Sequence, residues 1–152
     1  MITYLMNDLA EWGTYEVPPE MLMEIRKVFA TGWADEDQVR EMIADCWDRN
    51  HYVIDPHTAC GYFVMQQMPA DPQVPRVLLS TASPVQVPAR VNEALGLKAD
   101  GTDFECMDEL HAKSGTPIPQ MLRNLENAEV RFRDCVEVSD MGHYVEECAD
   151  RL

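Results

Sequence analysis

The side chains of this sequence that could do chemistry are scattered along the chain rather than clustered. The four histidines stand far apart, at His51, His57, His111 and His143. Only His57 lies in a recognisable motif, Asp55-Pro56-His57-Thr58, which is typical of a helix N-terminus capped by Asp55. A capping or packing role is therefore a simpler interpretation of His57 than proton transfer.

The cysteines favour neither a metal site nor a disulfide framework. Their number is odd and none is in C-x-x-C spacing: they are Cys46, Cys60, Cys106, Cys135 and Cys148. Reduced thiols that fill a core are the simpler interpretation. A cysteine–histidine nucleophile pair stays open, because such residues meet only in the fold, but no cysteine is singled out. The acidic runs at 35–37 and 146–147 are typical of solvated faces, and no metal site is predicted.

Two hydroxyls end the best strand candidate of the sequence, which runs from Arg76 to Thr81. This short apolar run does not alternate with polar residues, and it therefore predicts a strand buried on both faces. Sheets of that kind bind ligands at the carboxyl ends of their strands, where Ser80 and Thr81 stand here. Taken alone, the hydroxyl of Thr81 is expected to bond its own loop.

Helical patterns cover most of the remaining chain. Apolar spacing, caps and prolines predict helices at about 3–11, 18–30, 35–47, 56–68, 88–95, 104–113, 118–125 and 139–152. Residues 130–133 alternate and predict an edge strand. We therefore expect an α/β fold that is rich in helices, with a small sheet of two or three strands. Such a sheet is small for a doubly wound fold, so residues 1–152 are expected to form a single domain or a domain fragment.

Composition excludes several classes of function. The 152 residues are 46% hydrophobic and 26% charged, which is typical of a globular protein. The net charge of −15 disfavours binding to nucleic acid and to anionic membranes, and no apolar run is long enough to cross a bilayer. The first residues have no basic region followed by an apolar stretch, so we expect a cytoplasmic protein.

Three stretches together resemble one enzyme family. They are Tyr52 to Ala59, Val77 to Pro84 with the following 88–96, and Ile118 to Phe132 ahead of a closing helix. Their order and spacing resemble the end of bacterial threonine synthases, and the resemblance covers essentially the whole chain. Its most specific part is Asp55-Pro56-His57-Thr58-Ala59.

The resemblance implies a fold, a reaction and a cofactor. Threonine synthases are pyridoxal-phosphate (PLP) enzymes of the tryptophan-synthase-β-like class, and they convert O-phosphohomoserine and water to threonine and phosphate. This chain is similar to the C-terminal portion of their large domain. By resemblance, Thr81, with Ser80 beside it, would place a hydroxyl at the pyridine nitrogen of the cofactor, while Asp55, His57 and Thr58 would form the neighbouring pocket wall.

Two parts of such an enzyme are not recognisable in this sequence. None of Lys27, Lys98 and Lys113 stands in a context like that of the family's Schiff-base lysine, and the seven glycines are too scattered to build a phosphate loop. We therefore expect no catalytic residue here, no PLP bound to this chain alone, and no activity without a missing N-terminal portion of the enzyme. Self-association through exposed apolar faces is a further expected contact.

One loop departs from the family. Where the family reads Ala-His-Pro-Ala-Lys-Phe, this chain reads Ala82-Ser83-Pro84-Val85-Gln86-Val87, so a role of the loop in binding substrate is in doubt. The altered loop and Met1 motivate an alternative, a stand-alone binding or regulatory module derived from the enzyme tail. An unrelated small enzyme that uses a cysteine or histidine is a third hypothesis.

Overall fold

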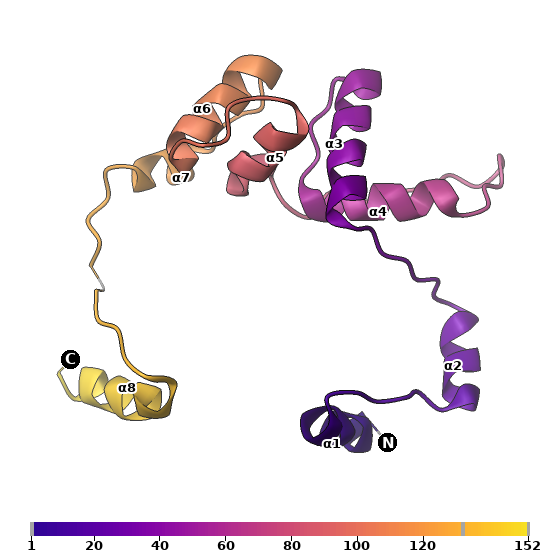
Figure 1. Cartoon of the computed structure of the whole chain (residues 1–152), viewed down its shortest axis with the longest axis horizontal. Coiled ribbons are helices and arrows are strands. Elements are labelled where there is room, and N and C mark those ends of the chain that lie inside the picture. Colours follow the sequence, from indigo (N-terminus) through magenta and orange to yellow (C-terminus); the bar gives the residue numbers. More distant parts are fainter. Residues whose placement is uncertain (1, 132, 152) are drawn as a thin grey trace. The chain divides into compact units, whose positions relative to one another are not determined.

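The computed structural model describes residues 2–131 and 133–151, and its regular elements there are helices (Figure 1). In chain order they are α1 (Ile2–Trp12), α2 (Pro19–Arg26), α3 (Glu36–Asn50), α4 (Pro56–Gln67), the 3-10 turn η1 (Pro84–Gln86), α5 (Pro88–Ala94), α6 (Asp103–Ser114), α7 (Gln120–Leu125), the 3-10 turn η2 (Val138–Asp140) and α8 (Met141–Asp150). The chain divides into two compact units, Met1–Thr116 and Pro117–Leu152.

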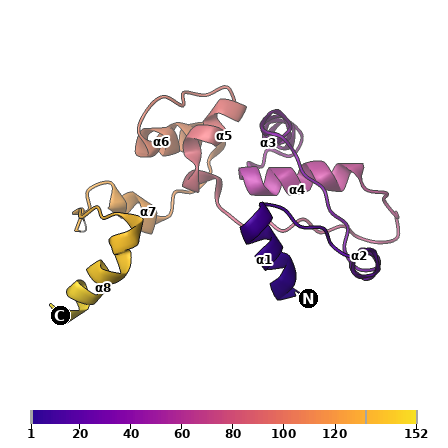
Figure 2. The same cartoon turned by 60° about the horizontal axis from the view of Figure 1, so that its bottom comes forward.

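The predicted small sheet is wrong, because none of the described residues lies in a strand. A strand needs the backbone of a neighbour to complete its hydrogen bonds, and no described segment pairs with residues 76–81. These residues instead return alongside α4 in irregular conformation (Figures 1 and 2), with Val77 and Leu79 78% and 74% exposed. The predicted edge strand at 130–133 fails in the same way at its described residues, while Phe132 lies outside them.

The core of the first unit lies where α3 packs against α4 and α5, and α5 packs against α6. Met42, Ile43 and Cys46 form the buried stripe of α3, as its apolar spacing predicted. Its start is a capping box, in which Gln38 N–H donates to Asp35 Oδ1 at 2.8 Å and Asp35 N–H donates to Gln38 Oε1 at 2.9 Å. Local sequence thus fixes where α3 begins and which face it buries.

A buried amide joins α5 to α6. The side chain of Asn92 is fully buried, and its Nδ2 donates to the carbonyl oxygens of Lys98 at 2.8 Å and Cys106 at 3.0 Å. Thr102 and Glu105 form a second capping box at the start of α6. The loop between the two helices is therefore held at both of its ends.

The second unit is built from short elements that bury little. None of the described residues of 117–151 is buried, although Tyr144 Oη donates to Asp134 Oδ2 at 2.7 Å. This bond holds the proton of Tyr144 and raises the pKa of its hydroxyl. The last helix was predicted to begin at 139, but Ser139 lies inside η2, and α8 begins at Met141.

A membrane-spanning helix is not found among residues 2–131 and 133–151, because the helices there are too short or too polar to cross a bilayer.

Candidate functional site

The Asp55-Pro56-His57-Thr58 motif forms the first turn of α4, as predicted. Asp55 is the N-cap and Pro56 the first helical residue, and Asp55 Oδ1 accepts the backbone N–H of His57 at 2.9 Å and of Thr58 at 3.3 Å. The hydroxyl of Thr58 donates to Asp55 Oδ2. These bonds use both carboxylate oxygens, so the first turn is satisfied from within.

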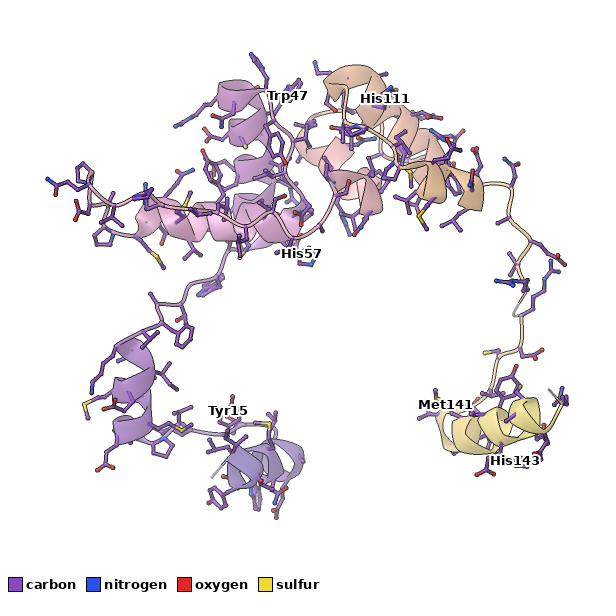
Figure 3. All side chains as sticks on the ribbon, turned by 180° about the vertical axis from the view of Figure 1, so that it is seen from behind. Tyr15, Trp47, His57, His111, Met141 and His143 are labelled. Carbon is purple, nitrogen blue, oxygen red and sulfur yellow. The ribbon has the colours of Figure 1, made fainter. Side chains whose placement is uncertain are left out.

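The buried carboxylate also positions the imidazole of His57. Asp55 is fully buried and Thr58 nearly so, while the side chain of His57 is 77% exposed (Figure 3). Burial alone would raise the pKa of Asp55, but the hydrogen bonds from Thr58 and His57 outweigh it and hold the pKa below its usual range. An ionised carboxylate only accepts, so His57 Nδ1, at 3.1 Å from Asp55 Oδ1, is the donor of this bond, and Nε2 is an acceptor in the neutral form of the ring.

The segment that carries Ser80 is fastened to α4 at two points. Arg76 Nη1 donates to the carbonyl oxygen of Met65 at 2.6 Å, near the end of the helix. Leu78 lies against Gly61, where an added Cβ would stand only 3.0 Å from Leu78 Cδ1. The missing side chain of Gly61 therefore leaves room for Leu78 to pack close to the helix.

A cavity of about 390 Å³ opens between α3, α4 and this segment. Both Thr58 and Ser80 line it, and the rest of its lining is Cys46, Asn50, Tyr52, Ile54, Tyr62, Met65 and Leu78. Burial is the main cause that raises the pKa of the Cys46 thiol, so this cysteine is held in its unreactive protonated form. The cavity is a largely apolar cleft whose lining includes the hydroxyl-bearing residues Thr58, Ser80, Tyr52 and Tyr62, and it is suited to a flat ring rather than to a charged group.

The structure brings only some of the predicted site residues together. Thr58 and Ser80 share the cavity, and Asp55 lies buried behind Thr58. His57 lines a different cavity, formed with α3 and α5. Thr81 is exposed and lines neither cavity.

In the part of the chain that the structure describes, neither a lysine nor a metal-binding cluster is placed at these two cavities. Among the described residues, none of the three lysines lines the cavity of Ser80 or that of His57. In the same part of the chain no group of three histidine, cysteine, aspartate or glutamate side chains is placed to hold a metal ion. The residues that line the cavity of Ser80 therefore offer hydrogen-bonding groups and an apolar shape.

Residues 58–145 match the family described as "Threonine synthase, C-terminal", which is more than half of the chain. The chain belongs to this family. The match includes Thr58, Ser80 and Thr81 and begins just after Asp55 and His57. It also runs through both compact units, so the threonine synthase C-terminal pattern is not confined to the first.

The proteins that the chain is similar to are a threonine synthase and a threonine synthase-like protein, and both are much longer than this chain. The chain is 33% identical to the threonine synthase of Schizosaccharomyces pombe over 98 residues, which are 62% of this chain and 19% of that protein. It is 26% identical to threonine synthase-like 2 of Rattus norvegicus over 144 residues, which are 88% of this chain and 29% of the relative. The chain thus spans less than a third of the length of these relatives.

A solved structure agrees with the sequence relatives. The PLP-bound threonine synthase from Brucella melitensis matches with a TM-score of 0.58 and 28% identity, over 71% of this chain and 24% of that one. The resemblance inferred from the sequence to the threonine synthase family is therefore confirmed.

Sequence reasoning missed most of the lining of the cavity. Tyr62 and Met65 stand four and seven residues after Thr58 on α4, so helical spacing could have placed all three on one face. Cys46 and Asn50 come from α3, and their meeting with α4 is a tertiary contact that no local pattern predicts.

Proposed function

We propose that residues 1–152 are the C-terminal segment of a PLP-dependent threonine synthase, which converts O-phosphohomoserine and water to threonine and phosphate. The observation that carries the proposal is the family match over 58–145, because it includes Thr58 and Ser80, which share one cavity. In this proposal the segment forms one wall of the cofactor site and has no activity alone.

The residues present fit one side of a PLP site. Ser80 and Thr81 carry exposed hydroxyls at the end of their segment, and the cleft beside Ser80 is lined by Tyr52 and Ile54, which suit the face of an aromatic ring. We propose that Thr81, with Ser80 beside it, places a hydroxyl at the pyridine nitrogen, and that Asp55, His57 and Thr58 form the adjoining wall. When bound, PLP supplies the electron sink of the reaction. The lysine that anchors it would come from the rest of the enzyme.

The partner in this proposal is the remaining portion of the enzyme. Large apolar side chains of the first unit are exposed, among them Trp33 at 75% and Val77 at 78%. Exposed apolar surface of this kind is typical of an interface that another protein part covers. Residues 1–152 would then act as one fragment of a larger domain in the cytoplasm, where reduced cysteines are the norm.

A complementation experiment tests the proposal. The N-terminal portion of the Schizosaccharomyces pombe threonine synthase, ending where its similarity to this chain begins, is co-expressed with the 152-residue chain. We expect phosphate release from O-phosphohomoserine with PLP for the pair and none above blank for either part. Activity of the chain alone would contradict the proposal. A pair that forms a stable complex but remains inactive would contradict it too, and would favour a binding module instead.

Reduction with borohydride provides a second readout. The chain alone, incubated with a modest excess of PLP and reduced, should keep its unmodified mass, because none of its described lysines lines the cavity of Ser80. A single stoichiometric adduct on one lysine would show that the chain anchors the cofactor by itself.

A further inference from the structure

A second cavity, separate from the one that holds Ser80, lies between α3, the first turn of α4, and α5. Its volume of about 510 Å³ falls within the range of roughly 300–1,000 Å³ that is typical of small-molecule sites. All of its lining residues belong to the first unit. The cavity is thus complete within the part of the chain that has a core.

The charged lining of this cavity is balanced. Glu36 and Arg40 stand one turn apart on α3, and Arg90 and Glu93 stand one turn apart on α5. Arg90 Nη1 lies 3.1 Å from Glu93 Oε2, and Arg40 pairs with Asp37. A guanidinium has five N–H donors, so one ion pair leaves donors of each arginine for a ligand.

Two acceptors face these donors. Glu36 has no hydrogen-bond or ion-pair partner that the structure records among residues 2–131 and 133–151. His57 Nδ1 donates a hydrogen bond to Asp55, so Nε2 is an acceptor in the neutral form of the ring. A carboxylate and a positioned imidazole are together suited to receive an ammonium group.

The floor of the cavity is apolar. Val39 and Ile43 lie one turn apart on the same face of α3, and Val87 faces them from the turn before α5. Ile43 is only 1% exposed, which makes this floor a part of the core. A short aliphatic side chain could rest there, while a large polar group would lose its hydration.

We propose that this cavity binds a small aliphatic α-amino acid as a zwitterion. Its carboxylate would bond Arg40 and Arg90, and its ammonium group would bond Glu36 and Nε2 of His57. A simple anion would leave Glu36 facing a like charge, and a simple cation would meet two guanidinium groups. Of the residues proposed for the cofactor site, only His57 lines this cavity, whereas Ser80 and Thr81 take no part in it, so the two proposals can be tested separately.

The proposal can be tested with one amino acid and two analogues, each of which lacks one of its two charges. The 152-residue chain, free of PLP, is titrated with L-2-aminobutyrate, butyrate and 2-aminobutan-1-ol, and the backbone amides of α3, α4 and α5 are followed by NMR. We expect saturable shifts with 2-aminobutyrate, and affinities weaker by roughly tenfold or more for the two analogues, because each lacks one charge-assisted contact.

Charge-removing variants locate the site. Glu36→Gln and Arg90→Gln should each weaken binding of 2-aminobutyrate by roughly tenfold or more. Arg49→Gln is the matched control, because Arg49 pairs with Asp45 on α3, is 69% exposed and lies outside the cavity lining. Glu36 is exposed, so its variant should keep the amide spectrum of the folded chain.

Three results would overturn the proposal. Butyrate that binds as tightly as 2-aminobutyrate would mean a plain anion site. An unchanged affinity in Glu36→Gln would remove the ammonium contact. Absence of any saturable shift with 2-aminobutyrate up to about 10 mM would mean that the cavity takes no amino acid of this size.

Discussion

Asp55 is the residue on which the candidate site depends, because its one buried carboxylate accepts hydrogen bonds from four groups. It caps α4 through two backbone N–H groups, accepts the hydroxyl of Thr58 and fixes the tautomer of His57. The motif was predictable as a helix cap, since an aspartate before a proline is a local signal. Its link to the ring of His57 was not, because the orientation of a side chain depends on what surrounds it.

Removing the cap should destabilise the first unit. We expect Asp55→Ala to lower the free energy of unfolding by about 1–2 kcal/mol, toward the upper end for an N-cap, because a buried threonine hydroxyl also loses its partner. Urea unfolding followed by circular dichroism measures the change. Asp35→Ala removes the exposed cap of α3 and should cost about 1 kcal/mol or less. Equal losses in the two variants would contradict a special role for Asp55.

The same carboxylate should make stability depend on pH. The pKa of Asp55 is lower in the folded chain than the ordinary value of 3.8 for an aspartate, so the fold favours the ionised form. Its contribution is therefore fully present above that value and is lost as the pH falls through the lowered pKa. We expect the stability difference between the wild type and Asp55→Asn to shrink between pH 6 and about pH 3. A difference that stays constant over this range would show that Asp55 is not held ionised by the fold.

At the scale of elements, helices were predictable and strands were not. A helix bonds within itself, so caps and apolar spacing such as Asp35 with Gln38 and the Met42–Cys46 stripe carry its information locally. The apolar run from Arg76 to Thr81 indicated a strand buried on both faces, but a strand exists only through neighbours. In this chain no described segment supplies them, so the same residues lie irregular beside α4.

Within the candidate site, the predictable residues were those that a local sequence pattern or the family resemblance marks. Asp55 and the start of α4 followed from the sequence, and the family resemblance pointed to Ser80 and Thr81. The separation of His57 from Ser80 into two cavities did not follow, because α3 and α4 line both cavities while α5 completes one and Leu78 and Ser80 complete the other, and no local pattern predicts these tertiary contacts.

The loop before α3 docks on α4 through a glycine, and this contact gives an element-scale prediction. A Cβ at Gly32 would stand 2.7 Å from Val64 Cγ1 and 2.8 Å from Cγ2, and the β-branched valine has little rotamer freedom to move away. We expect Gly32→Ala to lower the free energy of unfolding by about 1–3 kcal/mol in urea.

Two further variants separate this clash from effects of glycine itself. Val64→Ala removes the obstructing methyl groups, so the added cost of Gly32→Ala should largely disappear in that background. Gly142→Ala in α8 meets nothing within 4 Å and should leave the unfolding of the first unit unchanged. A full cost of Gly32→Ala in the Val64→Ala background would place the strain in the backbone instead.

At the scale of the whole molecule, stability should be unevenly distributed between the two units. The first contains fully buried side chains such as Ile43, Val91 and Leu110, whereas no described residue of 117–151 is buried. Helices of six and ten residues are too short to be stable in water without packing. Protection from amide hydrogen exchange should therefore be concentrated in α3 to α6, and the amides of α7 and α8 should exchange almost as fast as in an unfolded chain.

Because the family match runs through residue 145, hydrogen exchange in α8 also tests the proposal that the chain is a segment of a threonine synthase. If 117–152 belongs to a larger domain, the complex with the N-terminal portion of a threonine synthase should slow exchange in α8, while α6 should change little because Leu110 is already fully buried. Strong protection of α8 in the chain alone would mean that the second unit is stable without a partner. Unchanged exchange in α8 within a complex that releases phosphate would mean that the closing helix is not needed to complete the enzyme.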